Sequence, residues 1–438
     1  MPDQQPVQPL SAFTATLRPP GSKSLTNRAL LLAALARGTS TLRDPLWADD
    51  TRRMVDALVA LGVPVKKTPD GREVTVRGLA GFSTRDSAAL DLGNAGTAMR
   101  SLTAACSLGI GRYRLDGDSR MRQRPIGELV DALRQLGASI AYDGPPGYPP
   151  LIVSGSGLAG GTVVMKPTLS SQFISALLMV GPYCRRPLTL HFDGPVTSRP
   201  YVEMTLNLMA RFGIQCQVDA GFTTIAVPQG EFRGQDYAVE PDASNASYFL
   251  AAAALVPGSR CTIEGLGRQS LQGDVAFADV LHQMGAGLTF GPDFITIMAP
   301  PAGTPLQGFH GDLNHMPDMV QTLAAVALFA AGPTTIRNVG NLRVKETDRL
   351  GALKTELSKT GARVTINGDD LTIAPAPGDV SSGLTAPSGG FDTYNDHRMA
   401  MSLALIGLRL PGVRINNPAC VAKTFPDYFE YLEGLGKR

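Results

Sequence analysis

The chain has 438 residues, more than the roughly 250 to 300 at which a single hydrophobic core stops growing, so we expect two domains. Its 40 Lys and Arg against 38 Asp and Glu leave a net charge of +2, which excludes a general attraction to nucleic acid or to an anionic membrane. We recognise no signal peptide, no membrane-spanning stretch and, in five scattered cysteines, no disulfide framework or metal site, so we expect a cytoplasmic protein without metal.

Amphipathic helices recur along the chain, and each ends at a glycine that precedes a short strand. The position after a helix often takes the left-handed conformation that glycine adopts at little cost. The spacing of about 75 residues indicates six copies of one structural repeat. The repeating glycines are Gly62, Gly137, Gly213, Gly285, Gly361 and Gly436.

A second series of helices runs in phase with the first, and each member opens at a polar residue. These helices, such as 29–36 and 247–255, are apolar nearly all round, which is typical of buried helices. Each repeat is therefore predicted to have the element order β-α-β-α-β-β. The sixth lacks a strand after Gly436, and we predict that a strand near 13–17 completes it. The predicted helix starts are Ser24, Thr97, Ser171, Ser244, Asp318 and Asp396.

Three repeats per domain divide the chain into a first domain, 22–240, and a second, 1–21 plus 241–438. Pro19, Pro20 and Gly21 are typical of one hinge, and Pro241 of the other. We expect the binding site in the cleft between the domains. A solenoid without chemistry is the alternative, but the polar residues at the helix starts argue against it.

Those helix starts favour anion binding, because a helix N-terminus exposes unpaired N–H groups and partial positive charge. Lysine, arginine, serine and asparagine cluster in segments 21–28, 93–100, 170–172 and 395–398. Any one of these residues can be a simple N-cap, but the set predicts a site for anions. Segment 21–24 is not a P-loop, so nucleoside triphosphates are not indicated. Arg120 and Arg122 fit a solvated face equally well.

Two carboxylates lie among these cations. Asp318 opens a buried helix, and Glu346 lies between Lys345 and Arg349. As a pair they suit a general base and a general acid, yet a helix cap and an ion-pair partner explain them equally well. Their spacing in the sequence does not decide between these two roles. No metal-ligand spacing and no nucleophile elbow is present.

Four segments carry a close resemblance to a known family: LRPPGSKSLTNRALLLAAL at 17–35, LGNAGTAMR at 92–100, RVKETDRL at 343–350 and NDHRMAM at 395–401. In this order they resemble the EPSP synthase family of enolpyruvyl transferases (3-phosphoshikimate 1-carboxyvinyltransferases). The resemblance implies an α/β fold of two similar domains, each an inside-out barrel of three β-α-β-α-β-β repeats.

It also implies transfer of the enolpyruvyl group of phosphoenolpyruvate to the 5-hydroxyl of shikimate 3-phosphate, in chorismate and aromatic amino acid biosynthesis. We expect no cofactor, no nucleic acid or membrane partner, a monomer, and inhibition by glyphosate. The nearest rival, the sister transferase that acts on UDP-N-acetylglucosamine, has a reactive cysteine in the loop that corresponds to 119–125, where this chain has none. A non-catalytic paralogue and an RNA-end binder are more distant alternatives.

The resemblance further implies roles for individual residues. Asp318 resembles the group that takes the proton of the attacking hydroxyl, Glu346 the acid that protonates the methylene carbon, and Lys23 the group at the departing phosphate. Asn94 and His397 are further candidates. The residues implied for phosphoenolpyruvate are Lys23, Gly96, Arg124, Gln172, Arg349, Arg398 and Lys423. Those implied for shikimate 3-phosphate are Lys23, Ser24, Arg28, Ser170, Ser171, Gln172, Ser198, Tyr201, Asp318, Asn341 and Lys345.

One position departs from the family pattern. Relatives commonly have proline where this chain has Ser101. Proline early in a helix stiffens the first turn without removing a needed hydrogen bond. We therefore expect Ser101 to relax that turn and to weaken glyphosate binding, while Gly96 preserves sensitivity.

Overall fold

A computed structural model describes residues 3–83, 85–166, 169–374 and 383–437. Chain contacts divide it into two units, which we call unit 1 (Met1–Pro20 with Pro241–Arg438) and unit 2 (Gly21–Glu240). Within the described ranges, no helix combines the length and the apolar character that crossing a membrane would require.

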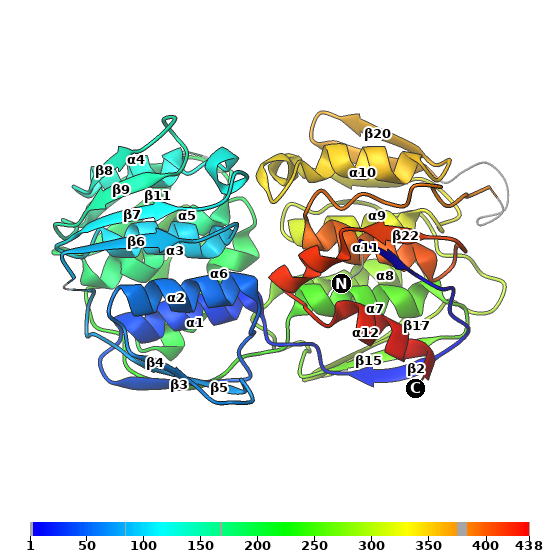
Figure 1. Cartoon of the computed structure of the whole chain (residues 1–438), viewed down its shortest axis with the longest axis horizontal. Coiled ribbons are helices and arrows are strands. Elements are labelled where there is room, and N and C mark those ends of the chain that lie inside the picture. Colours follow the sequence, from blue (N-terminus) through cyan, green and yellow to red (C-terminus); the bar gives the residue numbers. More distant parts are fainter. Residues whose placement is uncertain (1–2, 84, 167–168, 375–382, 438) are drawn as a thin grey trace. The chain divides into compact units, whose positions relative to one another are not determined.

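Unit 2 alternates strands and helices, with 3-10 helices marked η (Figure 1). Its elements are α1 (Lys23–Leu35), β3 (Thr39–Arg43), α2 (Asp49–Ala60), β4 (Val65–Lys67), β5 (Glu73–Arg77), β6 (Ser87–Asp91), α3 (Gly96–Cys106), β7 (Arg112–Asp116), η1 (Met121–Gln123), α4 (Gly127–Gln135), β8 (Ser139–Tyr142), β9 (Leu151–Ser154), β10 (Gly161–Met165), α5 (Ser171–Val180), η2 (Gly181–Tyr183), β11 (Leu188–Phe192), α6 (Arg199–Arg211), β12 (Gln217–Val218), β13 (Thr224–Val227) and β14 (Asp236–Ala238).

Unit 1 follows the same alternation and includes the N-terminal strands. Its elements are β1 (Gln4–Pro6), β2 (Thr14–Leu17), α7 (Ala243–Leu255), β15 (Arg260–Glu264), η3 (Gly273–Ala276), α8 (Phe277–Gln283), β16 (Gly287–Phe290), β17 (Phe294–Met298), β18 (His310–Asp312), η4 (Pro317–Met319), α9 (Val320–Ala327), β19 (Thr334–Arg337), η5 (Gly340–Val344), α10 (Arg349–Ser358), β20 (Arg363–Asn367), β21 (Asp370–Ala374), α11 (His397–Gly407), β22 (Arg414–Asn416), η6 (Pro418–Lys423), α12 (Tyr428–Gly434) and η7 (Leu435–Lys437).

The strands form one recurring sheet. In unit 2 the strand orders are β14-β3-β5-β4, β6-β7-β9-β8 and β10-β11-β13-β12, and in unit 1 they are β16-β17-β15-β2, β18-β19-β21-β20 and the two-stranded β1-β22. Each four-stranded sheet contains one parallel pair, and its other neighbours are antiparallel. This is the sheet that a β-α-β-α-β-β repeat produces.

The strand predicted near 13–17 exists as β2, but its predicted place is wrong. It pairs in parallel with β15 of the fourth repeat, with Leu17 opposite Ile263. The sixth repeat is extended instead by β1, which pairs antiparallel with β22. The pairing of β2 is needed because β14, the first strand of the fourth repeat in sequence, pairs with β3 of the first repeat. Each unit thereby forms its sheets from its own residues.

The prediction of buried helices is confirmed. Every residue of α3, α7 and α11 is buried. Within unit 2, α3 packs on α1 and α5, and within unit 1, α7, α9 and α11 pack on one another (Figure 1). Because these helices bury all their faces, the polar residues at their N-terminal ends are held by a rigid core.

The repeating glycines are confirmed at five places. Gly62, Gly137, Gly213, Gly285 and Gly361 all have φ between +87° and +108°. A side chain would be strained in this conformation, so glycine is required. The sixth prediction is wrong, because Gly436 lies inside η7 rather than after a helix in a left-handed position.

Candidate active site

Arg28 of α1 is a buried cation in a neutral shell. Its Nε donates to Thr205 Oγ1 at 2.7 Å, and its Nη2 donates to Ser175 Oγ at 3.2 Å. Its other bonds reach the carbonyl oxygens of Ser24 and Tyr201. Burial lowers the pKa of Arg28 to about 10, because no carboxylate among the described residues neutralises it. A buried arginine held in this way attracts an anion.

Lys23 is the first residue of α1, five positions before Arg28. Ser22 caps the helix by accepting a hydrogen bond from the Leu25 N–H at 3.4 Å. Lys23 Nζ lies 3.7 Å from Asp50 Oδ2, and both side chains are largely buried. The ion pair holds the ammonium group at the helix start.

Two other helix starts of unit 2 are joined directly. Ser170 caps α5 by accepting from the Gln172 N–H at 3.3 Å, and Gln172 Nε2 donates to Thr97 Oγ1 of α3 at 3.4 Å. Ser198 occupies the N-cap position of α6 with φ +52° and is buried, and Tyr201 lies one turn further along α6. Arg28 thus contacts α5 at Ser175 and α6 at Tyr201 and Thr205, the two helices whose first turns carry the other predicted residues.

Arg124 is placed against Gly96 by a loop. Its Nη1 donates to Asn94 Oδ1 at 2.8 Å and to the Asn94 carbonyl oxygen at 3.1 Å. A methyl group added at Gly96 would lie 2.6 Å from Arg124 Nη2, which is closer than side-chain carbons approach other atoms. Arg100 supports the same loop by donating to the Pro125 carbonyl oxygen at 2.8 Å. Gly96 therefore provides the space that the Arg124 guanidinium occupies.

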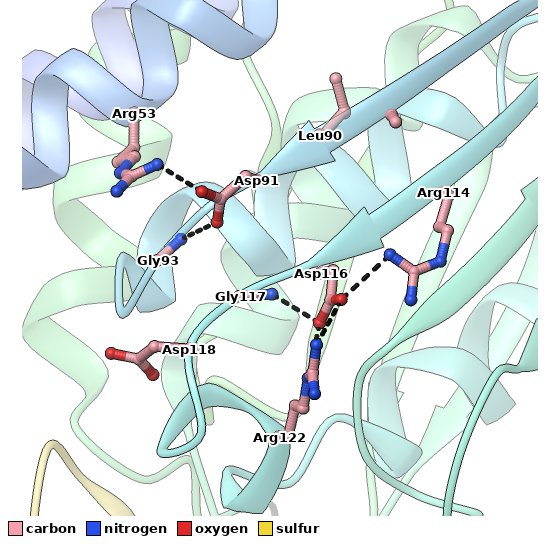
Figure 2. A pocket seen from close by; sticks show the side chains of 10 residues that line it. Arg53, Leu90, Asp91, Gly93, Arg114, Asp116, Gly117, Asp118 and Arg122 are labelled. Carbon is pink, nitrogen blue, oxygen red and sulfur yellow. Dashed lines mark hydrogen bonds and ion pairs between the residues drawn. The ribbon is translucent and has the colours of Figure 1, made fainter.

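Asp116 fixes the other end of this loop (Figure 2). It accepts from Arg122 Nη2 at 2.8 Å, from Arg114 Nη1 at 3.0 Å and from the Gly117 N–H at 2.8 Å. These groups line an open pocket of about 420 Å³ together with Arg53, which pairs with Asp91. The Arg122 side chain is half exposed and bound to Asp116, which agrees with the reading of a solvated charged face.

Ser101 occupies a different helical position from the predicted one. It is buried and is the sixth residue of α3, beyond the first turn in which N–H groups lack helical partners. The expectation that proline here gives up no needed hydrogen bond is therefore wrong.

In unit 1, Arg349 binds three carboxylates. Its Nε and Nη2 donate to the two oxygens of Asp396 at 2.8 and 3.2 Å, its Nη1 donates to Asp318 Oδ1 at 3.0 Å, and its Nη2 donates to Glu346 Oε2 at 3.0 Å. Burial by itself would lower the pKa of Arg349, but the three carboxylates raise it well above its ordinary value. The two predicted acid and base residues are therefore brought to one guanidinium.

Arg398 binds the second oxygen of Asp318, with Nη2 at 2.9 Å from Oδ2. Its Nη1 lies 3.5 Å from the hydroxyl of Tyr248, a fully buried residue whose pKa burial raises to about 12. Asp318 lies in η4, one short turn before α9. Two arginines from two helices thus orient one carboxylate.

The other predicted residues of unit 1 lie on neighbouring turns. Asn341 lies within η5 and Lys345 directly after it, and η5 packs on α10, which begins at Arg349. Lys423 ends η6, which packs on α11. His397 is fully buried, with Nδ1 3.6 Å from Asp396 Oδ1. Among the described residues, no group of His, Cys, Asp and Glu side chains is arranged to hold a metal ion.

Sequence reasoning missed three residues that shape these clusters. Asp396 was predicted only as a helix start, although it caps α11 and also binds Arg349. Its position between Asn395 and His397 in a charged segment was the available signal. Ser175 and Thr205 gave no signal, because they lie on helix faces far from Arg28 in sequence.

Known proteins are similar to this chain over nearly its whole length. The family model for EPSP synthase (3-phosphoshikimate 1-carboxyvinyltransferase) matches residues 7–432. The chain belongs to the EPSP synthase family. It is 47% identical over 428 residues to the 3-phosphoshikimate 1-carboxyvinyltransferase of Marinomonas sp. (strain MWYL1), and 47% identical over 433 residues to that of Aeromonas salmonicida (strain A449), with 98% of each chain covered.

A solved EPSP synthase structure from Acinetobacter baumannii is similar to this chain with a TM-score of 0.80 and 28% sequence identity, over 99% of this chain and 98% of that one. The α/β fold predicted from the repeats and the EPSP synthase resemblance predicted from the motifs are both confirmed.

Proposed function

We propose that this EPSP synthase family member transfers the enolpyruvyl group of phosphoenolpyruvate to the 5-hydroxyl of shikimate 3-phosphate and releases inorganic phosphate. The observation that carries the proposal is the Arg349 cluster, in which Asp318 and Glu346 lie within 3.0 Å of one guanidinium. The names of the relatives supply the reaction, and the cluster supplies a pair of carboxylates suited to its two proton transfers.

The proposed reaction is an addition followed by an elimination. Glu346 gives a proton to the methylene carbon of phosphoenolpyruvate, and Asp318 takes the proton of the attacking hydroxyl, whose oxygen bonds to the neighbouring carbon. The tetrahedral adduct then gives a methyl proton back to Glu346, and the phosphate leaves with the electron pair of its C–O bond and takes up the proton that Asp318 had accepted. Lys23 stabilises the charge on the departing phosphate.

The hydrogen bonds constrain this assignment. Glu346 Oε2 accepts from Arg349, so a proton held for transfer sits on the other oxygen, Oε1. Three carboxylates meet two guanidiniums in the cluster of Arg349 and Arg398.

We assign the remaining residues by the resemblance and by the charge of the two substrates. Arg28 and its hydroxyl neighbours suit an anion such as the phosphate of shikimate 3-phosphate, since that cation has no carboxylate partner among the described residues. The proposed residues for phosphoenolpyruvate are Lys23, Gly96, Arg124, Gln172, Arg349, Arg398 and Lys423. Those for shikimate 3-phosphate are Lys23, Ser24, Arg28, Ser170, Ser171, Gln172, Ser198, Tyr201, Asp318, Asn341 and Lys345.

A phosphate-release assay tests the reaction. With phosphoenolpyruvate present, we expect release with shikimate 3-phosphate and none with UDP-N-acetylglucosamine. Release with the nucleotide sugar alone would overturn the assignment in favour of the sister transferase.

We further propose that the protein acts in the cytoplasm as a monomer, without a cofactor, and that glyphosate competes with phosphoenolpyruvate. These proposals rest on the family resemblance. Light scattering after gel filtration measures the mass, and an inhibition series at several phosphoenolpyruvate concentrations tests the competition.

A further inference from the structure

A cavity of about 240 Å³ lies at the C-terminal ends of the buried helices of unit 1. Leu255 ends α7, Phe329 follows α9, and Arg409 follows α11. A loop between β17 and β18 forms the opposite wall. The lining residues are Ala254, Leu255, Pro257, Pro300, Pro301, Ala302, Gly303, Thr304, Pro305, Leu306, Phe329 and Arg409.

This cavity is separate from the candidate active site. Asp318 and Asp396 lie at the N-terminal ends of α9 and α11, whereas Phe329 and Arg409 lie beyond their C-terminal ends. The 11 residues of α11 span about 16 Å at 1.5 Å per residue. A ligand in the cavity would therefore not touch the Arg349 cluster.

The walls are mostly apolar: Leu255, Leu306 and Phe329 are buried, and residues 301–305 of the loop are exposed. Only Thr304 and Arg409 among the lining residues carry a polar side chain. The loop contains three prolines, whose fixed φ reduces the conformational freedom lost on binding. Backbone hydrogen bonds hold the loop at both ends. The Ala299 N–H donates to the Ser259 carbonyl oxygen at 2.9 Å, and the Ala331 N–H donates to the Leu306 carbonyl oxygen at 2.7 Å.

Arg409 is the one charged group on these walls, and it is half-buried. Its Nη1 donates to the carbonyl oxygen of Leu255 at 2.6 Å, and its guanidinium lies over the Phe329 ring, 5.5 Å from the centroid. In the part of the chain that the structure describes, no carboxylate pairs with it, and burial lowers the pKa of Arg409.

A guanidinium has five N–H donors in a planar fork, and stacking on a ring leaves its edge available. One hydrogen bond to Leu255 uses only part of this capacity. A carboxylate would complete the remaining hydrogen bonds and would neutralise a charge that burial disfavours. The apolar walls would bury the rest of the same ligand.

We propose that this cavity binds a small aromatic monocarboxylate, with its carboxylate on Arg409 and its ring against the proline loop. An apolar cavity of about 150 Å³ holds benzene, so about 240 Å³ accommodates one ring with a short acidic chain. A nucleotide is too large, and a phosphate ion would leave the apolar walls unused.

Isothermal titration calorimetry with phenylacetate tests the site. We expect saturable binding to the full chain. Phenylacetamide and acetate should both bind at least roughly tenfold more weakly, because phenylacetamide lacks the carboxylate and acetate lacks the ring. Arg409→Met should weaken phenylacetate binding roughly ten- to hundredfold, with kcat and KM for the proposed transfer unchanged.

Two further variants keep the test decisive. Arg268→Met is the matched control, since Arg268 also stacks on a phenylalanine, 4.7 Å from the Phe290 centroid, but does not line the cavity. It should leave phenylacetate binding unchanged. Ala302→Phe adds a ring to the exposed loop wall of the cavity, keeps Arg409 and should weaken binding. If phenylacetate does not saturate by about 10 mM, or binds Arg409→Met and Ala302→Phe as well as the natural chain, the proposal is overturned.

Discussion

Arg349 and Asp396 are joined inside unit 1 by two hydrogen bonds, with Nε 2.8 Å from Oδ2 and Nη2 3.2 Å from Oδ1. Asp396 is fully buried, and its Oδ1 also accepts from the backbone N–H of Arg398 at 2.9 Å. One carboxylate thus positions two arginines, one through its guanidinium and the other through the start of α11. This relationship makes Asp396 a positioning residue for the proposed site.

Asp396→Asn should lower the free energy of unfolding by about 1.5–3 kcal/mol, because a buried charge loses a charged hydrogen-bond partner while Arg349 keeps Asp318 and Glu346. It should also raise KM for phosphoenolpyruvate. Urea denaturation and steady-state kinetics measure these effects. Asp392→Asn is the control, since the Asp392 side chain is 56% exposed and its ion pair contributes less than about 1 kcal/mol. Equal stability of the two variants would contradict the assignment.

Glu346→Gln should lower kcat by roughly 10²- to 10⁴-fold and should change KM for both substrates much less. The amide preserves the shape of the side chain but cannot supply the proton. Glu356→Gln removes another buried glutamate of unit 1, one that binds Lys359 and Tyr394. The folded molecules of the Glu356→Gln variant should have the same kcat as the natural chain. Near-normal turnover in Glu346→Gln would reduce Glu346 to an ion-pair partner of Arg349.

Gly96→Ala should raise KM for phosphoenolpyruvate more than it lowers kcat. The added methyl group would lie 2.6 Å from Arg124 Nη2, so the guanidinium must move from its position beside Asn94. Gly434→Ala, where nothing lies within 4 Å of the added methyl, provides the control. Unchanged kinetics in Gly96→Ala would show that the position of Arg124 does not matter for phosphoenolpyruvate.

Ser101→Pro should lower the free energy of unfolding by up to about 3 kcal/mol, because the sixth residue of α3 lies within the helical hydrogen-bond ladder. The same change tests the remaining glyphosate expectation, that proline at this position tightens inhibition, at a residue that lies beyond the turn that carries Gly96. Ser101→Ala separates loss of the hydroxyl from the effect of the ring. If Ser101→Pro bound glyphosate no more tightly than the natural chain, Ser101 would be a neutral substitution for inhibition.

Glu128 should make stability depend on pH. Burial raises the pKa of this carboxyl above its ordinary value of 4.5, and its Oε2 is buried without a hydrogen-bond partner. The folded chain therefore binds this proton more tightly than the unfolded chain does. The resulting stabilisation is present below the unfolded pKa and is lost as the pH rises through the folded pKa.

Glu128→Gln removes this titration. The unfolding free energy of the natural chain should therefore fall relative to that of the variant between about pH 4 and pH 8. Urea denaturation at several pH values measures the difference. Glu433→Gln is a control on a glutamate whose side chain is bound to Gln5 at the surface. A constant difference between Glu128→Gln and the natural chain across this range would contradict the prediction.

The sequence by itself determined the repeat, because its causes are local. A left-handed position such as Gly62 or Gly137 requires glycine within its own turn, and a helix that is apolar on every face, such as α7, must be buried wherever it lies. The polar residues at the starts of these helices could be recognised for the same reason, and three of the four EPSP synthase motifs contain such a start.

The tertiary structure decided which residues meet. Arg349 and Asp396 are 47 positions apart, and Arg28 and Thr205 are 177 apart, so no periodicity in the sequence predicts their hydrogen bonds. The exchange that pairs β2 with β15 and β14 with β3 was also hidden, because a strand's pattern fixes which face is buried but not which edge it joins. Such contacts depend on how complete helices and sheets pack, and that packing is a property of the folded unit.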